Sequence, residues 1–463
     1  MENFTYYPKD DSNSRYCCIG DYNILQSKPI IYLENNRYFI PIVYQLFVSI
    51  YESPFYWIMS DKHYEKTAGS HRGKSGEDMA YELIVPVFGE ENVLRDIEIK
   101  DSKHHTITDI DTLCLIDSKA ICFQIKSKRL SQTSRNGSLE QLTKDFRCAV
   151  QDAYEQGLIC RKYLLNNNDV FFWSKEKQCK INISSNLNDI YIICLTSENY
   201  PALTHQVHEL LSINDNNPIP IVFSIFDLRL ITHYLDNPYK FTYYIRQRIQ
   251  TNSVFYSDNE INYLAYHLLH KLHLGNDYNR VYLANDFACE IDKDYYPYIS
   301  GKKKLKEQCV IKNKCENPRF ESLCKYILKS SIPNKVDVVF FLYDLSSESI
   351  DKLIESIDIV KQRSLKNNTI ENARFVFQSL DATIGITTIA VQTSCNLQEN
   401  ILYLSELHKY YHKADKWLTI GVYNNTSASM IDMILYIDRK WTKDDILEEI
   451  CKKNIDTTGK IKQ

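Results

Sequence analysis

The sequence predicts an α/β protein in which a mixed N-terminal sheet is flanked by helices and a second α/β domain follows. Three patterns lead to this prediction. Residues 110–125 are typical of a β-hairpin, because two apolar segments flank a polar turn. Residues 190–195 and 219–224 are short continuous apolar runs, which indicate strands buried on both faces. Residues 336–463 alternate between strand and helix patterns, which indicates a further α/β sheet.

The length and charge of the chain limit its organisation and its partners. Its 463 residues are enough for two or three domains. We predict a helical and aromatic cap at 1–68, a central domain at 69–255 and a C-terminal α/β domain at 256–463, which starts just before a capping box at 257–260. The formal net charge of −4 excludes a globally basic protein, so any nucleic-acid binding must be local.

Cysteine usage and hydropathy predict a cytoplasmic protein. The 14 cysteines are scattered without a C-x₂-C pair, which favours buried free thiols in a reducing compartment over zinc ligands. The N-terminus lacks the basic start and apolar core of a signal peptide. The longest apolar stretch, residues 38–59, is interrupted by two prolines, a glutamine and a glutamate, so we expect no membrane association.

The hairpin carries polar side chains where a buried hairpin should have none. Asp111 interrupts the first strand, and Gln124 and Lys126 interrupt the second. Residues i and i+2 of a strand share a face, so Gln124 and Lys126 point the same way. A turn at residues 117–118 places Asp111 opposite Gln124 or Ile125. Burying these groups without partners is costly, which indicates either a structural ion pair or a metal site for phosphodiester chemistry.

An acid on one strand followed by Gln-x-Lys on the next resembles the core of the PD-(D/E)xK nuclease superfamily. The glutamine variant looks most like the Mrr-type restriction endonucleases and the NERD-type nuclease domains. In that family a helix carrying an acid precedes the hairpin and another helix follows the lysine. Here Glu77 lies in a predicted helix that precedes the hairpin, and residues 139–156 have helical spacing. The resemblance covers roughly residues 70–160 and implies a restriction-endonuclease-like sheet and metal-dependent hydrolysis of DNA.

The resemblance also implies a role for each site residue. Asp111, the side-chain oxygen of Gln124 and the backbone carbonyl of Ile125 would bind Mg²⁺ (or Mn²⁺), completed by Glu77 directly or through a water. Lys126 would orient or help deprotonate the attacking water and offset charge in the transition state. Asp109 shares the face of Asp111 and is a weaker candidate. Many family members carry an acid where Gln124 stands, so a fold that binds nucleic acid without cutting it stays open.

Basic residues are concentrated beside this motif. From Lys119 to Arg147 there are seven Lys and Arg against two acids. We expect a phosphate-binding track made by Lys128, Arg129, Arg135, Lys144 and Arg147, with Gln156 as a further phosphate contact or a support of the site. A solvated charged face is the alternative. The expected partner is DNA, with RNA left open. We also expect a second copy of the chain or a partner protein of a restriction or antiviral defence system.

The remaining segments carry no catalytic constellation. Helices are predicted at 226–235, 257–274, 347–362, 399–412 and 442–452, and strands at 336–343, 374–378, 384–392, 417–423 and 431–437. His408 and His412 have helical spacing, but Lys409 stands where a zinc protease needs glutamate. We therefore expect a regulatory, recognition or oligomerising role for the C-terminal domain.

One motif suggests a competing function. Ala68 to Ser75 fits a relaxed phosphate-loop pattern that would make the chain an NTPase through Gly73-Lys74-Ser75. The charged segment at residues 60–66 is a poor candidate for the buried strand that must precede such a loop. We expect instead that Gly73 and Gly76 interrupt the chain before the helix that carries Glu77.

Overall fold

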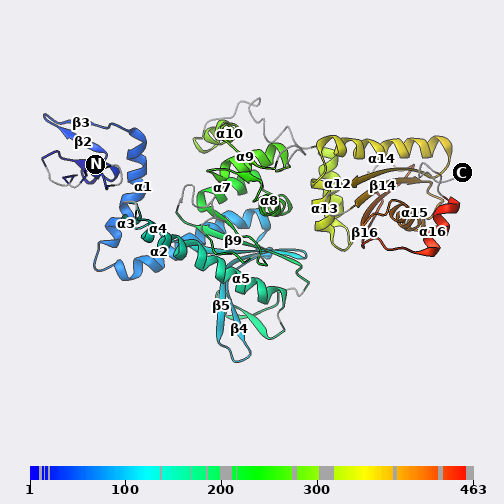
Figure 1. Ribbon diagram of the computed structural model, residues 1–463, viewed down its shortest axis with the longest axis horizontal. Helices are drawn as coiled ribbons and strands as arrows, with labels where there is room; N and C mark the ends of the chain where they lie inside the picture. Colours follow the sequence, from blue (N-terminus) through cyan, green and yellow to red (C-terminus); the bar gives the residue numbers. More distant parts are fainter. Residues whose placement is uncertain are drawn as a thin grey trace. The chain divides into compact units, whose positions relative to one another are not determined.

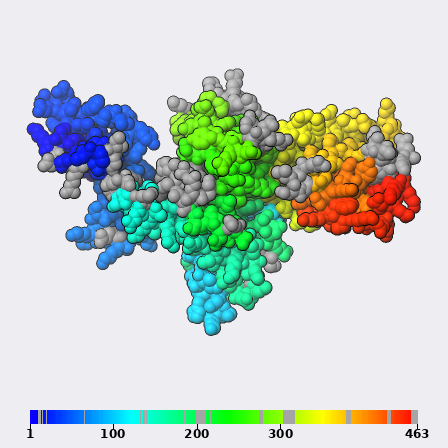
Figure 2. Space-filling model, viewed as in Figure 1, coloured from blue at the N-terminus to red at the C-terminus, as the bar shows by residue number. Residues whose placement is uncertain are grey.

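The computed structural model describes residues 1–9, 13–14, 16–18, 21–135, 138–166, 168–183, 186–198, 211–214, 216–273, 279–301, 317–378, 383–425 and 431–454. The protein is a mixed α/β structure, so the predicted fold class is confirmed. The chain forms two compact units, which are Met1–His267 with Leu274–Ile291 (unit 1) and Leu268–His273 with Asp292–Gln463 (unit 2). Figures 1 and 2 show unit 1 in blue to green and unit 2 mainly in yellow to red.

A seven-stranded mixed sheet organises unit 1. Its strand order is β10-β9-β6-β5-β4-β7-β8. The strands are β4 (Val93–Asp101), β5 (Thr106–Ile116), β6 (Lys119–Lys126), β7 (Val170–Ser174), β8 (Cys179–Ile181), β9 (Asp189–Thr196) and β10 (Ile221–Ser224). The pairs β4–β5 and β5–β6 are antiparallel, as predicted for the hairpin, whereas β6, β9 and β10 run parallel. The carboxyl ends of these three parallel strands therefore meet at one edge of the sheet.

Helices cover both faces of this sheet. Helix α2 (Glu65–Phe88) lies on one face, where its Gly76 approaches Ile125 of β6. Helix α5 (Asp152–Leu165) lies on the other, where Cys160 contacts Gln124. A β-carbon on Gly157 would come within 2.5 Å of the Ile192 side chain, so glycine allows α5 to approach β9 closely. One helix from before the hairpin and one from after it thus cover its two faces.

Shorter elements complete unit 1. The N-terminal segment contains β1 (Thr5–Tyr6), β2 (Ile30–Leu33), β3 (Arg37–Phe39) and α1 (Val43–Met59). Helices α3 (Gln132–Arg135) and α4 (Leu139–Phe146) precede a π-helical turn at Arg147–Gln151 that continues into α5. Helices α7 (Ile225–Tyr234), α8 (Pro238–Gln250) and α9 (Glu260–His270) follow β10, with a small sheet of β11 (Phe255–Tyr256) and β12 (Val281–Tyr282). The predicted junction at residue 256 falls in β11, whereas the structure divides the chain within α9 and α10 (Ala288–Ile299).

The relaxed phosphate-loop pattern is not a loop. Ala68 to Ser75 lies inside α2, which begins at Glu65, so the expected interruption before Glu77 is wrong. The reason is packing against the sheet. A β-carbon on Gly76 would lie 2.8 Å from the Ser127 hydroxyl, so this glycine lets α2 rest on the end of β6. A phosphate loop needs free backbone N–H groups before a helix, and these residues are helical themselves.

Unit 2 contains a four-stranded sheet with the order β13-β14-β15-β16. The strands are β13 (Glu371–Gln378), β14 (Thr383–Val391), β15 (Lys416–Tyr423) and β16 (Met433–Asp438), and only β14 and β15 are parallel. The helices are α12 (Pro318–Lys329), α13 (Lys335–Tyr343), α14 (Ser347–Asn367), α15 (Leu397–Tyr411) and α16 (Asp445–Asn454). Hydroxyl pairs help to join α14 and α15 to neighbouring strands, as between Ser405 and Thr419 at 2.6 Å.

One predicted strand of unit 2 is wrong. Residues 336–343 form α13 instead, and every residue from Val338 to Tyr343 is buried. A short apolar run that is buried on all sides has neither the period of a strand nor that of a helix, so its pattern cannot distinguish the two. Over the described part of the chain, no helix has both the length and the apolar character needed to cross a membrane.

Candidate active site

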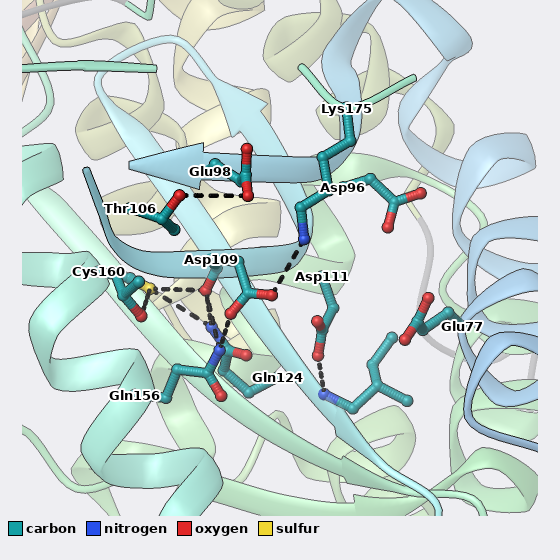
Figure 3. Close-up of polar contacts among 12 residues, drawn as sticks. Glu77, Asp96, Glu98, Thr106, Asp109, Asp111, Gln124, Gln156, Cys160 and Lys175 are labelled. Atoms are coloured by element: carbon teal, nitrogen blue, oxygen red, sulfur yellow. Dashed lines mark hydrogen bonds and ion pairs between the residues drawn. The ribbon is translucent and has the colours of Figure 1, made fainter. Parts of the chain in front are cut away.

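The polar residues of the hairpin meet where the ladder between β5 and β6 ends. The last paired residues are Thr112 and Phe123, so Asp111 and Gln124 come next. Beyond that pair, the Asp111 carboxylate accepts a hydrogen bond from the Ile125 N–H at 2.7 Å (Figure 3). A side chain thus replaces the backbone acceptor of the neighbouring strand. This opens a notch between two strands that are otherwise buried.

The backbone carbonyl of Ile125 faces the same side as its N–H. The backbone carbonyl of Lys126 accepts a hydrogen bond from the N–H of Ser197, so the backbone N–H and C=O groups of Lys126 face β9. The N–H and C=O groups of one strand residue face the same neighbouring strand, and successive residues alternate. The carbonyl of Ile125 is therefore directed towards β5 and Asp111. This direction is the one that the predicted role of a neutral oxygen ligand requires.

Gln124 supplies a second neutral oxygen. Its side chain is fully buried, and its Nε2 donates to the Asp109 carbonyl at 3.0 Å. Its Oε1 atom is buried and accepts no hydrogen bond from any described residue. A buried acceptor without a partner is costly, and a cation would relieve that cost. Oxygen ligands of this kind suit Mg²⁺, so the donor set fits the implied ion.

Lys126 is positioned by the helix that follows the hairpin. Its Nζ atom donates to Gln156 Oε1 at 3.0 Å. The Nε2 atom of Gln156 donates to the Asp109 carbonyl at 3.1 Å and also to the Asp109 carboxylate. Gln156 therefore links the lysine to the strand that bears the aspartates. This position would allow it to support the site, and its role stays a prediction.

The environment of Asp111 raises the pKa of its carboxyl group. Burial raises its pKa from 3.8 to about 6. The hydrogen bond from Ile125 and the charge of Lys126 lower this pKa, and the charges of Glu77 and Asp109 raise it. A buried carboxylate whose pKa is shifted by a charged neighbour is a frequent feature of functional sites. Binding of a cation would favour the ionised form.

Glu77 approaches the notch from α2, and Asp96 approaches from β4 (Figure 3). The register of β4 and β5 places Asp96 opposite Asp111, and Asp96 has a positive φ of 52°. Non-glycine residues rarely adopt this conformation, and such strain is concentrated at functional sites. Sequence reasoning missed Asp96. Residues 93–99 carry Arg95 and Glu98 as well, so no pattern in this segment distinguishes Asp96.

Lys74 of α2 neutralises part of this carboxylate group. Its Nζ atom lies 3.0 Å from an Asp96 oxygen and 3.4 Å from a Glu77 oxygen. Within the described ranges, no three His, Cys, Asp or Glu side chains are grouped to hold a metal ion. A cation in the notch would therefore bind through Asp111, neutral oxygens and waters, with Glu77 direct or water-mediated. Mg²⁺ sites commonly use only one or two carboxylates.

The predicted basic track divides into exposed and buried residues. Lys144 and Arg147 are exposed, and Lys128 is exposed with its Nζ atom 3.6 Å from Asp145. Arg129 is buried, and its guanidinium donates to the Glu52 carbonyl at 2.9 Å and pairs with Glu198. It therefore cannot face a phosphate track without leaving these contacts. The side chain of Arg135 lies outside the described residues.

Comparison with known proteins adds no family. The chain matches no protein-family model, and no curated protein is similar to it in sequence. The geometry of the notch is thus the basis for the functional proposal.

Proposed function

We propose that the chain is a metal-dependent endonuclease that hydrolyses phosphodiester bonds of DNA, in the manner of the Mrr-like branch of the PD-(D/E)xK superfamily. The observation that carries the proposal is the end of the β5–β6 ladder. There the Asp111 carboxylate accepts a hydrogen bond from the Ile125 N–H, and the charge of Lys126 lowers the pKa of Asp111. The buried side-chain oxygen of Gln124 accepts no hydrogen bond from any described residue. A structural ion pair would set Asp111 against a cationic side chain, whereas its carboxylate accepts a backbone N–H.

Each residue of the notch has a part in the proposed reaction. Asp111, Gln124 and the Ile125 carbonyl would hold Mg²⁺ or Mn²⁺, with Glu77 completing the site directly or through a water. The bound ion would lower the pKa of a water and neutralise charge on the phosphate. Lys126, held by Gln156, orients the attacking water and offsets the negative charge that grows on the phosphate oxygens. Lys128, Lys144 and Arg147 bind the phosphate backbone without reading its sequence.

The proposed setting is cytoplasmic restriction or antiviral defence. The described cysteines are free thiols, which suits a reducing compartment. A nuclease in that compartment needs restraint, so we also propose an activating trigger or a partner, with unit 2 as its receiving domain.

A second function is favoured by one residue. Gln124 is neutral where related sites carry an acid, which removes one charge that would attract a cation. The alternative is therefore a protein of the same fold that binds nucleic acid without cutting it. It would share the exposed basic residues but would not depend on Lys126.

Plasmid cleavage tests the proposal. Purified full-length protein is incubated with supercoiled plasmid in Mg²⁺ or in EDTA, alongside Lys126→Ala and Lys162→Ala. Lys162 is an exposed lysine of α5, so its variant controls for loss of one positive charge. We expect nicking or linearisation that needs Mg²⁺, is lost in Lys126→Ala and persists in Lys162→Ala. Equal cleavage by the two variants would refute the site. Equal DNA binding without cleavage by any protein would favour the binding function.

A further inference from the structure

A cavity of about 360 Å³ opens beside the candidate active site. Helices α1 and α2 form most of its wall, and its floor includes Arg129 and Glu198, which follow the carboxyl ends of β6 and β9. Ligands of α/β proteins commonly bind outside the carboxyl ends of parallel strands. The proposed catalytic residues do not use this cavity.

The cavity lies within a few residues of Lys126. Arg72, which lines it, donates from Nε to the carbonyl of Ser127 at 3.1 Å, and the Ser127 hydroxyl donates to the Arg72 carbonyl at 3.3 Å. Ser127 follows Lys126 directly. Ser75 also lines the cavity, and it precedes Glu77 by two residues on α2. The cavity and the notch are therefore built from neighbouring parts of α2 and of the segment at the end of β6.

The walls combine aromatic rings with guanidinium groups. The guanidinium groups of Arg72 and Arg129 lie 4.7 and 5.0 Å from the centre of the Phe55 ring. Tyr51 and Tyr64 also line the cavity, and their side chains are 52% and 38% exposed, so their rings remain accessible to a ligand. Aromatic rings and arginine planes are the surfaces on which single-stranded nucleic acids stack their bases.

The floor supplies polar groups for the edge of a base. Glu198 is paired with Arg72 and Arg129, so carboxylate oxygens and guanidinium N–H groups meet there. The volume lies at the low end of the range for small-molecule sites, which run from roughly 300 to 1,000 Å³. It is large enough for one nucleobase, and a base that is stacked and paired in a duplex cannot enter it without leaving the stack. A lipid surface is a poor alternative, because the paired charges at the floor would have to be buried in hydrocarbon.

We propose that this cavity receives one unstacked nucleobase next to the scissile phosphate. The preferred substrate is then DNA with an unpaired nucleotide, either single-stranded or locally melted, because an intact duplex must first unpair a base at a cost of a few kcal/mol. This inference rests on the proposed function for its phosphate site. It adds a substrate class that the catalytic residues alone do not specify.

Binding measurements separate this inference from cleavage. Full-length protein carrying Lys126→Ala is titrated in EDTA with a fluorescein-labelled 20-nucleotide single strand and with its duplex. A third probe is the same single strand in which the central nucleotides are abasic. We expect the intact single strand to bind at least about tenfold more tightly than the other two probes. Equal binding of the intact and abasic strands would overturn the proposal, because the cavity would then read no base.

Variants of the wall assign the effect to the cavity. Tyr51→Ala and Tyr64→Ala each remove one ring and should weaken single-strand binding by about 5- to 150-fold, the range for loss of a base-stacking ring. Tyr51→Phe and Tyr64→Phe keep the ring and should bind as the parent does. Duplex binding should change little in all four. Circular dichroism identifies the variants that are folded. Because two tyrosines are tested separately, the experiment remains informative if one alanine variant does not fold. Alanine variants that bind the single strand normally would contradict the proposal.

The two proposals can fail separately. If binding depends on the base and requires the tyrosines, but the wild type does not cleave DNA, the base-binding cavity is supported and the nuclease function is rejected. Cleavage that needs Lys126 but is the same for single strand and duplex in wild type and tyrosine variants would retain the nuclease and reject the cavity. Tighter binding of an RNA single strand than of a DNA single strand would support the base-binding cavity and identify RNA, not DNA, as the preferred substrate.

Discussion

Two aspartates of unit 1 show how burial can serve either the fold or the candidate site. The Asp145 carboxylate accepts hydrogen bonds from the Ser131 N–H, the Ser134 hydroxyl and the Gln141 amide at 2.6 to 3.0 Å. Burial alone would raise its pKa, but these hydrogen bonds outweigh burial and lower the pKa to about 2. Asp111 accepts the Ile125 N–H, and burial raises its pKa to about 6.

The difference lies in the donors and charges around each carboxylate. Three neutral donors and the nearby Lys128 ammonium satisfy Asp145, so its ionised form stabilises the surrounding loop and α4. Asp111 accepts one backbone N–H and lies near the charge of Lys126, but two other carboxylates oppose its ionisation, so its ionised form would be stabilised further by a bound cation. A buried carboxylate is therefore a candidate metal ligand when its surroundings supply few hydrogen-bond donors or positive charges. It is a structural group when they supply enough of them.

The largest expected contrast is in cleavage. Asp111→Asn keeps the shape of the side chain and an acceptor for Ile125, but it removes the charge that would hold the cation. We expect it to slow plasmid cleavage by about 10²- to 10³-fold, the scale for losing one group that stabilises charge in the transition state. Asp145→Asn should cleave within a few-fold of wild type at a temperature where it stays folded. Similar losses in both variants would remove the distinction between the two aspartates.

Stability should change in opposite directions. The folded-state pKa of Asp111 is above its ordinary value of 3.8, so the stability from its protonated form is present below about pH 4 and is lost as the pH rises through 6. Asp111→Asn should recover up to about 3 kcal/mol at pH 7.5 in EDTA and nothing at pH 4. Calorimetry of the full-length chain measures this gain.

Asp145→Asn should have the reverse effect. Its amide cannot accept three hydrogen bonds with the strength of a carboxylate, so the variant should lose about 1–3 kcal/mol at pH 7.5. Because the pKa of Asp145 is lowered in the folded chain, its contribution is present above about pH 4 and is lost as the pH falls towards 2. The same sign for both variants at pH 7.5 would contradict the account.

The pH dependence of cleavage should be smaller but diagnostic. Only the ionised form of Asp111 binds a cation well, so cleavage at low Mg²⁺ should fall about tenfold per pH unit below about pH 6. Raising the Mg²⁺ concentration should move the midpoint to lower pH, because the ion and the proton compete for one carboxylate. Initial rates between pH 4.5 and 8 at two Mg²⁺ concentrations test this. A midpoint that does not respond to Mg²⁺ would assign the titration to another group.

The smallest expected effects are in the basic track. Lys144→Ala and Arg147→Ala should each weaken DNA binding a few-fold and reduce the slope of log affinity against log salt by about one. Both residues are exposed, so stability should change little. Lys162→Ala, at an exposed lysine later in the same helical segment, should leave the salt slope unchanged. Equal slopes in all three variants would reduce the track to a solvated face.

The sequence was sufficient for the hairpin. Two apolar segments around a polar turn predicted it, and the position of the turn placed Asp111 opposite Gln124 or Ile125; in the structure the ladder ends at Thr112 and Phe123, so Gln124 comes next. The sequence failed where tertiary packing decided the outcome. Residues 338–343 are all buried, and Gly76 allows the helix α2 to rest on Ser127.

Parts of the candidate site were likewise beyond pattern reasoning. Asp96 comes opposite Asp111 only through the register of β4, a pairing that no local pattern specifies. Arg129 belongs to a basic run in sequence, but its side chain turns inward to Glu52 and Glu198. Charge runs report composition, whereas the direction of each side chain depends on contacts with segments far away in the sequence.

Metal binding is the most direct test of whether the notch between β5 and β6 holds a cation. Mn²⁺ is titrated into full-length wild type, Asp111→Asn and Asp145→Asn, and free Mn²⁺ is followed by electron paramagnetic resonance without nucleic acid. We expect a site in wild type and Asp145→Asn that Asp111→Asn loses, with affinity that rises as the pH passes 6. Equal binding by wild type and Asp111→Asn would show that the notch between β5 and β6 is not the metal site.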